Sequence, residues 1–207
     1  MSSKSQPTTP TGWQAQKSAS TRNLIVKAAI RCFVELGYAR TTTTRIAEMA
    51  GLSRGAMLHH FPSKHDIVRA AVEYLHARRL NAFRKSVAAI PEDADRVRMA
   101  VQAYWDYIKH PMFVALFELS VAARTDPELE ALLKPSQEAF DQEWYRTARE
   151  LFPEWHDDNA FDLGLDLSRY LMEGMALSFL SHEQTERDKR LLLYLEDQLR
   201  ALRGRST

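Results

Sequence analysis

The side chains best suited to bind a metal ion lie close together: His59, His60, His65 and Asp66. Neighbouring residues on a helix point about 100° apart, so His59 and His60 are poorly placed to share one ion. The single cysteine, Cys32, lies on an apolar helical stripe and is interpreted as a core thiol rather than a nucleophile. The sequence has no HExxH, CxxC, GxSxG or glycine-rich phosphate loop. We therefore expect no metal centre, no cofactor and no enzymatic activity.

The charged residues point instead to a polyanionic partner. The 207 residues have a formal net charge of +1, but the charge is unevenly distributed. Residues 1–85 carry 14 Lys and Arg against 4 Asp and Glu, whereas residues 86–207 carry 14 against 23. A basic module beside an acidic one is typical of nucleic-acid-binding proteins, although such an imbalance can also arise by chance.

The elements that must position the basic side chains are unusually short. Residues 43–50 and 53–60 each have the pattern of about two helical turns, and Gly51 between them can adopt the left-handed conformation that ends a helix. Ser53 is a suitable N-cap for the second piece, in which few residues besides Met57 face the core. This pattern predicts a helix-turn-helix, whose second helix enters the major groove of DNA with its N-terminal residues toward the base edges.

The remaining chain also favours helices. Hydrophobic residues make up 45% of the sequence, and with 7 Gly and 8 Pro it lacks the many tight turns of a β protein. Helical spacing predicts an all-α fold of about nine helices. We expect four parts: a disordered arm at 1–20, a helix-turn-helix DNA-binding domain at 21–66, a connecting helix at 67–85 and a second helical domain at 86–207.

Local signals place several helix ends. Gly37 is expected to end the first helix, which should start at about residue 22. Capping boxes are predicted at Ser63-Lys-His-Asp66 and Thr185-Glu-Arg-Asp188. Pro91-Glu92 is expected to start the fifth helix, and Pro135 should kink or interrupt a later one.

A set of spaced residues within this region carries a family resemblance. They are Gly37-Tyr38, Thr41-Thr42, Ile46-Ala47, Ala50-Gly51-Leu52-Ser53, Gly55, His60-Phe61 and Ser63-Lys64. Together they resemble the N-terminal signature of the tetracycline-repressor (TetR) family of transcriptional regulators. The resemblance covers residues 21–70, while the rest of the chain fits by length, helix count and acidity.

The resemblance implies a role for individual residues. Those expected at a phosphate or the groove edge are Thr42, Thr43, Thr44, Arg45, His60 and Lys64. Those expected on the recognition helix against the DNA are Ser53, Arg54, Gly55, Ala56 and His59. Arg54 is the best candidate for base reading, because a guanidinium can bind guanine O6 and N7 together. Leu58 departs from the family, which usually has a tyrosine there to bind the DNA backbone. For Thr42, Thr43, His60 and Lys64 the alternative is capping, packing or solvation.

Aromatic residues and methionines are concentrated between residues 99 and 179. At helical spacing each is ordinarily a core residue, but a sensor domain also needs an apolar cavity with a few polar groups. The candidate ligand-binding residues are Tyr104, Trp105, Phe117, Phe140, Trp144 and Met175. Glu118, Gln137 and Arg169 are candidate polar anchors.

The segment 161–180 is apolar on more than one face, as is typical of a helix with two packing partners. With the leucine seam at 191–202, it predicts a four-helix interface across a two-fold axis, which the resemblance also implies. The candidate dimer-interface residues are Leu163, Leu167, Leu171, Gly174, Leu195 and Leu199. The alternative is that one subunit buries both faces itself.

These expectations combine into one functional hypothesis. The chain would be a homodimeric repressor that binds a palindromic double-stranded DNA operator and is released by a small apolar or aromatic effector. The alternative is a helical small-molecule carrier or protein-interaction bundle without sequence-specific DNA binding.

No apolar run is long enough for a membrane span and the first twenty residues lack a signal peptide, so a cytoplasmic location is expected.

Overall fold

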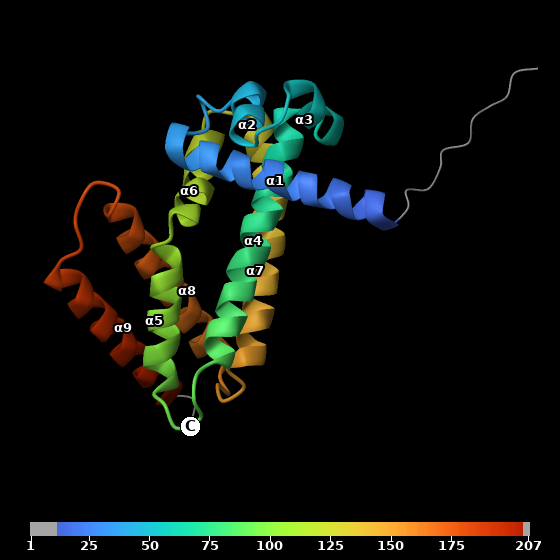
Figure 1. Ribbon diagram of the computed structural model, residues 1–207. Coiled ribbons are helices and arrows are strands. Elements are labelled where there is room, and N and C mark those ends of the chain that lie inside the picture. The colour runs from blue at the N-terminus through green and yellow to red at the C-terminus, as the bar shows by residue number, and fades with distance from the viewer. Residues whose placement is uncertain (1–11, 205–207) are drawn as a thin grey trace, which may run out of the picture. The chain divides into compact units, whose positions relative to one another are not determined.

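The computed structural model describes residues 12–204, apart from the side chain of Asp158. All regular structure in this range is helical, which confirms the all-α prediction (Figure 1). The helices are α1 (Gly12–Leu36), α2 (Thr43–Met49), α3 (Arg54–His60), α4 (Lys64–Ala88), α5 (Arg96–Ile108), α6 (Pro111–Ala123), α7 (Pro127–Leu151), α8 (Asp158–Ser178) and α9 (Glu186–Gly204). None of these helices is long and apolar enough to cross a membrane.

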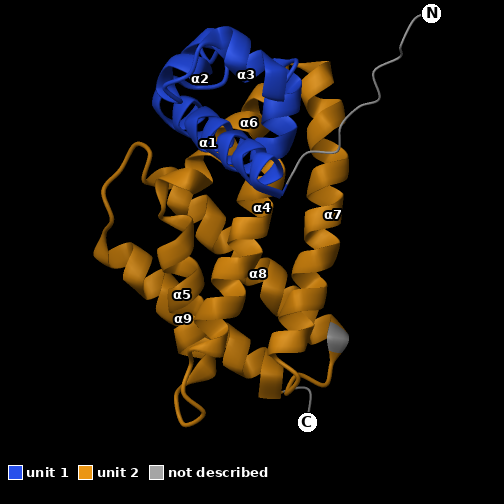
Figure 2. Ribbon diagram, turned by 45° about the vertical axis from the view of Figure 1, so that its right-hand side comes forward, with its two compact units in different colours: residues 1–71 blue, residues 72–207 orange. Residues whose placement is uncertain are grey.

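The chain forms two compact units, residues 1–71 and 72–207 (Figure 2). In unit 1, α1 packs against both α2 and α3. The centre of this unit is apolar and fully buried, and its largest side chains are Ile25, Phe33, Ile46, Met57, Phe61 and Ile67. Burial of Met57 confirms that the second short helix turns this side chain inward, and Phe61, the C-cap of α3, is buried as well.

The first helix is longer than predicted. It begins at Gly12, so the prediction of a disordered arm is wrong for residues 12–20, and residues 1–11 lie outside the described residues. All nine residues from Gly12 to Ser20 are exposed. Ala, Gln and Lys in this stretch are good helix formers, and extending an existing helix avoids the cost of nucleating one. Polar composition alone therefore did not distinguish a disordered arm from an exposed helical extension.

Several predicted helix ends are confirmed. Gly37 and Gly51 have φ angles of 77° and 67°, the left-handed values that end α1 and α2. In the Ser63–Asp66 capping box, a carboxylate oxygen of Asp66 accepts hydrogen bonds from the Ser63 amide and hydroxyl at 3.1 and 2.7 Å. The Thr185–Asp188 box makes the same two bonds at 2.6 and 3.0 Å.

Two expectations based on prolines differ from the structure: the start of the fifth helix and an interruption at Pro135. α5 starts at Arg96 rather than at Pro91, because Asp95 is its N-cap and accepts a hydrogen bond from the Arg98 amide at 3.1 Å. α7 continues through Pro135 as a single helix, so the predicted interruption does not occur. Pro135 lies on the exposed side of the helix, where water can bind the carbonyl that loses its partner.

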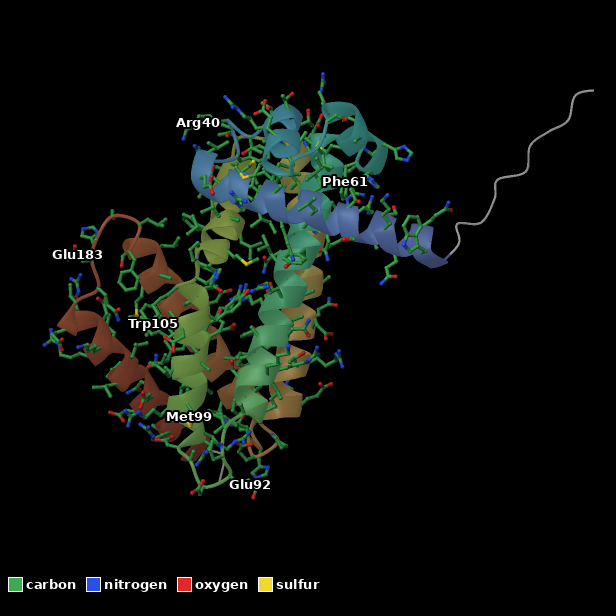
Figure 3. The ribbon with its side chains drawn as sticks, in the orientation of Figure 1. Arg40, Phe61, Glu92, Met99, Trp105 and Glu183 are labelled. Atoms are coloured by element: carbon green, nitrogen blue, oxygen red, sulfur yellow. The ribbon has the colours of Figure 1, made fainter. Side chains whose placement is uncertain are left out.

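Unit 2 is built around aromatic side chains. Within it α5, α8 and α9 pack against one another, and α6 packs against α7. Trp105 is buried and lies 5.4 Å from the ring of Phe179, whereas Met99, on the same helix, is 40% exposed (Figure 3). Phe83 of α4 stacks on Trp144 of α7 with ring centroids 4.5 Å apart. These contacts bring α4, α5, α7 and α8 to one hydrophobic core.

Cys32 belongs to the core of unit 1. Its side chain is fully buried, and its Sγ lies 3.9 Å from the sulfur of Met49. Burial raises the pKa of this thiol above its ordinary value. The prediction of a core thiol is confirmed.

Two glycines of the helix-turn-helix allow a matched stability test. Gly51→Ala is expected to lower the free energy of unfolding by about 1–2 kcal/mol, because alanine is strained at a φ of 67°. Gly55→Ala, inside α3 with no atom near its added Cβ, should leave the stability unchanged or raise it by up to about 1 kcal/mol. Urea unfolding followed by circular dichroism measures both changes, and equal effects would contradict the assigned conformations.

Candidate nucleic-acid interface and apolar cavity

Hydrogen bonds within unit 1 define the two short helices. The Thr42 hydroxyl caps α2 by accepting from the Arg45 amide at 3.2 Å, and the Ser53 hydroxyl caps α3 by accepting from the Ala56 amide at 3.2 Å. The Leu52 amide bonds to the Ala47 carbonyl at 2.9 Å and closes the turn between them. Each predicted cap therefore has a structural role that is compatible with a role at a phosphate, because a capping hydroxyl can still donate its own hydrogen.

Most of the predicted DNA-binding residues are accessible. The exposed ones are Thr42, Thr44, Arg45, Ser53, Arg54, Gly55, Ala56 and His59, and the half-buried ones are Thr43, His60 and Lys64. Among the described residues Arg54 makes no hydrogen bond or ion pair, so its guanidinium is free for a partner. Arg45 pairs with Glu48 at 3.3 Å, but both side chains are more than half exposed and such pairs are weak. Leu58 is half-buried.

His60 lies where α3 ends. Its carbonyl accepts a hydrogen bond of 2.5 Å from Arg22 of α1, and the Arg22 guanidinium lies 4.0 Å above the ring of Phe61. Desolvation, followed by the nearby charges of His59 and Arg22, lowers the pKa of His60. A neutral imidazole presents one donor and one acceptor rather than a positive charge. Arg22 was missed in the sequence because nothing in its spacing links it to a residue 38 positions away.

Lys64 is held by the loop that follows α1. Its Nζ donates to the Tyr38 carbonyl at 2.8 Å and lies 3.6 Å above the Tyr38 ring. These contacts fix the start of α4, so Lys64 has the packing role considered as an alternative, while its charge remains at the N-terminus of that helix.

Unit 2 contains a small apolar cavity of about 80 Å³. Its walls come from α4, α5, α7, α8, α9 and the loop between α7 and α8. The lining residues are Phe83, Arg96, Val97, Ala100, Val101, Tyr104, Trp144, Phe152, Glu154, Trp155, Phe161, Gly164, Leu165, Ser168, Arg169, Met172 and Leu199. Apolar and aromatic walls with a few polar side chains are typical of small-molecule sites.

The sequence identified only part of this lining. Tyr104 and Trp144 line the cavity, and so does the candidate anchor Arg169. The other candidates do not line it: Trp105, Phe117, Phe140, Met175, Glu118 and Gln137. Residue type does not reveal which side of a core helix faces a cavity. Phe140, for example, stacks on His76 at 4.5 Å instead, and burial lowers the pKa of that histidine to about 4.

A buried polar network lies beside the cavity. Arg79 of α4 donates to the hydroxyl of Tyr104 and to the carboxylate of Glu173, and the Tyr104 hydroxyl donates to the same carboxylate at 3.0 Å. Arg169 pairs with Glu173 at 3.2 Å and with Asp141 at 2.6 Å. Burial raises the pKa of Tyr104, so its phenol stays protonated. The network links α4, α5, α7 and α8, and two of its members, Tyr104 and Arg169, line the cavity.

The candidate dimer-interface residues fall into two groups. On α8, Leu163 and Leu167 are 58% and 38% exposed, Gly174 is exposed and Leu171 is half-buried. On α9, Leu195 and Leu199 are buried at 0% and 8% exposure within the subunit. The prediction that Leu195 and Leu199 lie on a dimer interface is wrong, because both side chains pack into the core of unit 2. Leu199 also lies 3.0 Å from the position that a Cβ at Gly164 would occupy. The exposed apolar residues of α9 are Leu193 and Tyr194.

An all-α chain that exposes the second helix of a helix-turn-helix is a DNA-binding regulator by class. Comparison with known proteins identifies the family. Residues 25–71 match the family described as bacterial regulatory proteins, tetR family. The uncharacterized HTH-type transcriptional regulator Rv2912c of Mycobacterium tuberculosis is 33% identical over 146 residues, which cover 68% of this chain and 75% of the relative. The chain belongs to the TetR family of helix-turn-helix transcriptional regulators, which is not a family of enzymes.

Two further comparisons agree with this assignment. The HTH-type transcriptional regulator CymR of Pseudomonas putida is 29% identical over 116 residues, covering 56% of this chain and 57% of CymR. The crystal structure of a TetR-family transcriptional regulator from Mesorhizobium loti superimposes with a TM-score of 0.69 at 15% identity, over 91% of this chain and 95% of the other. The structural similarity extends the shared fold beyond the helix-turn-helix to most of the chain.

Proposed function

We propose that this chain is a ligand-responsive repressor that binds a palindromic DNA operator as a homodimer and is released by a small apolar or aromatic effector. The observation that carries the proposal is the exposed outer face of α3, with Arg54 unpaired at its N-terminus, in a chain of the TetR family. Repression is the sign of regulation that the family resemblance implies. DNA binding as such follows from the helix-turn-helix, and the operator, effector and dimer are the proposed parts.

We propose that the helix-turn-helix domain at 21–66 binds DNA and that the connecting helix at 67–85 transmits the effect of the ligand to it. α4 begins in the residues of unit 1 and continues into those of unit 2. In unit 2 it contributes Phe83 to the cavity wall and Arg79 to the polar network. A ligand that binds the two states of α4 with different affinity would therefore change DNA binding, and only this difference in affinity can do so.

The proposal is tested by selecting bound sequences from a random pool of duplex DNA with the full-length protein. A dimer should enrich palindromes whose half-sites are about one helical turn, roughly 34–36 Å, or a multiple of it apart. Binding to the selected duplex should weaken steeply with salt. Recovery of no common sequence would favour the alternative, a helical carrier or protein-interaction bundle that does not read DNA sequence.

Arg54 and Lys64 are expected to contribute to DNA binding in different ways. Arg54→Ala should weaken operator binding by about 1–3 kcal/mol and relax the preference at one base position. Lys64→Ala should weaken binding to operator and random DNA alike, because a phosphate contact carries no sequence information. Fluorescence anisotropy on both duplexes measures the two affinities.

Arg31→Ala is the matched control for lost charge, since Arg31 is exposed on α1 and pairs only weakly with Glu35 at 3.7 Å. It should change neither affinity by more than a few tenths of a kcal/mol. The division of roles is refuted when Arg54→Ala and Lys64→Ala lose the same amount on both duplexes.

A further inference from the structure

We propose that Arg22 of α1 is a positioning residue for DNA recognition: it holds the C-terminal end of α3 against α1 and so sets the direction of the recognition helix. The inference rests on the proposed function, because it concerns how the operator is read. It assigns to Arg22 a role that needs no contact with DNA. Three features carry it: the weak anchoring of α3, the contacts of Arg22 at one end of that helix, and the place of Arg54 at the other end.

α3 has little within itself to fix its direction. It is seven residues long, and Met57 is its one buried side chain. Its N-terminal end is held by the Ser53 cap and by the bond from the Leu52 amide to the Ala47 carbonyl at 2.9 Å. A helix of two turns has little stability of its own and depends on tertiary contacts. The direction of α3 therefore depends on what holds its C-terminal end.

Arg22 makes two contacts at that end. Its guanidinium donates to the carbonyl of His60, the last residue of α3, at 2.5 Å. The same group lies 4.0 Å from the ring centroid of Phe61, the C-cap of α3, which lies next to α1 (Figure 3). The last carbonyls of a helix have no partner within it and carry partial negative charge, so a guanidinium there satisfies one of them and stabilises the helix end. These contacts join residues 38 positions apart and fix α3 to α1.

The direction of α3 decides which of its outer side chains can reach base edges together. Arg54 begins the helix and His60 ends it, so the two ends are about 9 Å apart at 1.5 Å per residue. A change of about 10° in direction would displace one end relative to the other by roughly 1.5 Å. Hydrogen bonds to base edges do not survive such a shift, because their lengths vary by only a few tenths of an ångström. Attraction to phosphates does survive it, because it falls off slowly with distance and carries no sequence information.

Binding of the full-length protein to the selected operator and to random duplex DNA tests the inference. Arg22→Met removes the donor and the charge but keeps an unbranched side chain that can cover Phe61. It should lower the ratio of operator affinity to random-DNA affinity about tenfold, the effect of losing one well-placed base contact. A merely structural role would lower both affinities by the same factor, because a smaller folded fraction binds either duplex less. Each variant is first compared with the native chain by circular dichroism.

Two further variants calibrate this result. Lys27→Met is the matched control, since Lys27 is exposed on α1 and makes no hydrogen bond or ion pair among the described residues. It should leave the ratio of affinities within about twofold of the native value. Arg22→Lys keeps the charge and a donor but lacks the planar group that lies over Phe61, so its ratio should fall between those of Arg22→Met and the native chain.

Two measurements separate positioning from direct contact with DNA. Loss of a phosphate contact would reduce the slope of log Kd against log salt concentration by about 0.9 for each subunit, whereas loss of a positioning residue leaves that slope unchanged. The double variant Arg22→Met/Arg54→Ala should lose less specificity than the product of the two single losses, because Arg22 acts through the placement of residues such as Arg54.

The inference is overturned if Arg22→Met keeps the ratio within about twofold of the native value, or if Lys27→Met lowers it equally. It is also overturned if Arg22→Met reduces the salt slope as a lost phosphate contact does, or if the losses of the double variant multiply. If the random pool yields no common sequence, the proposed function fails and this inference with it. If a palindrome is selected but its preference survives Arg22→Met, the repressor function stands and only the role of Arg22 fails.

Discussion

Replacing Glu173 by alanine is expected to lower the free energy of unfolding by about 3–5 kcal/mol, because it leaves a buried guanidinium without its carboxylate. The side chain of Arg79 is 4% exposed and that of Glu173 is 20% exposed. Among the described residues, the variant would leave Arg79 with the hydroxyl of Tyr104 as its hydrogen-bond partner and with the rings of Tyr104, Phe140 and Trp144 near its guanidinium, none of which carries a negative charge. Urea unfolding followed by tryptophan fluorescence measures the loss, since three of the four tryptophans lie in unit 2.

Glu150→Ala is the control for this change. Glu150 pairs with Arg146 at 2.7 Å, but both side chains are more than half exposed, so the expected loss is only about 0–1 kcal/mol. Equal losses for the two variants would show that the network around Arg79 contributes no more to stability than a surface ion pair does.

Leu167→Arg is expected to dissociate the proposed homodimer, with a loss of about 3 kcal/mol or more, roughly 100-fold in the dissociation constant. The exposed apolar stripe of α8 consists of Leu163, Leu167 and Tyr170, which are 58%, 38% and 65% exposed and lie on one helical face with Gly174. A charge in the middle of such an interface would have no partner. Operator affinity should fall in parallel, because two recognition helices are needed to bind both half-sites.

Analytical ultracentrifugation and anisotropy with the selected operator measure the two effects. Val121→Arg is the matched control, since Val121 is 49% exposed on α6 and lies outside the α8 stripe. It should leave both the dimer and operator binding intact. A native chain that sediments as a monomer at micromolar concentration, or a Leu167→Arg variant that stays dimeric, would contradict this interface.

The helix-turn-helix could be predicted from sequence because its signals are local. The left-handed Gly51, the Ser53 cap and the buried Met57 each depend on residues within a few positions, and all three are confirmed. The same reasoning explains the success of both capping boxes. It failed at the start of α1, where an exposed polar helix and a disordered arm have similar compositions.

The cavity and the surface of unit 2 could not be predicted in the same way. Their residues are joined by contacts between distant helices, such as the bond between Arg79 and Glu173 across 94 positions. Helical periodicity predicted that Leu163 and Leu195 lie on apolar stripes of their helices. Only the packing of α8 and α9 shows that Leu195 faces the core and that Leu163 faces outward. The DNA, ligand and dimer roles of individual residues therefore stay predictions until the variants are measured.

The buried position of Cys32 has a practical consequence. It is the single cysteine of the chain, it has no exposed surface, and its raised pKa keeps it in the unreactive thiol form. A cysteine introduced at an exposed site outside the predicted DNA-binding and dimer-interface residues, such as Glu35 of α1, should therefore take up a maleimide dye or a nitroxide spin label selectively, with Cys32 left in place. Energy-transfer or electron-resonance distances between such labels would then report in solution how far the two copies of unit 1 in a DNA-bound pair separate when an effector is added.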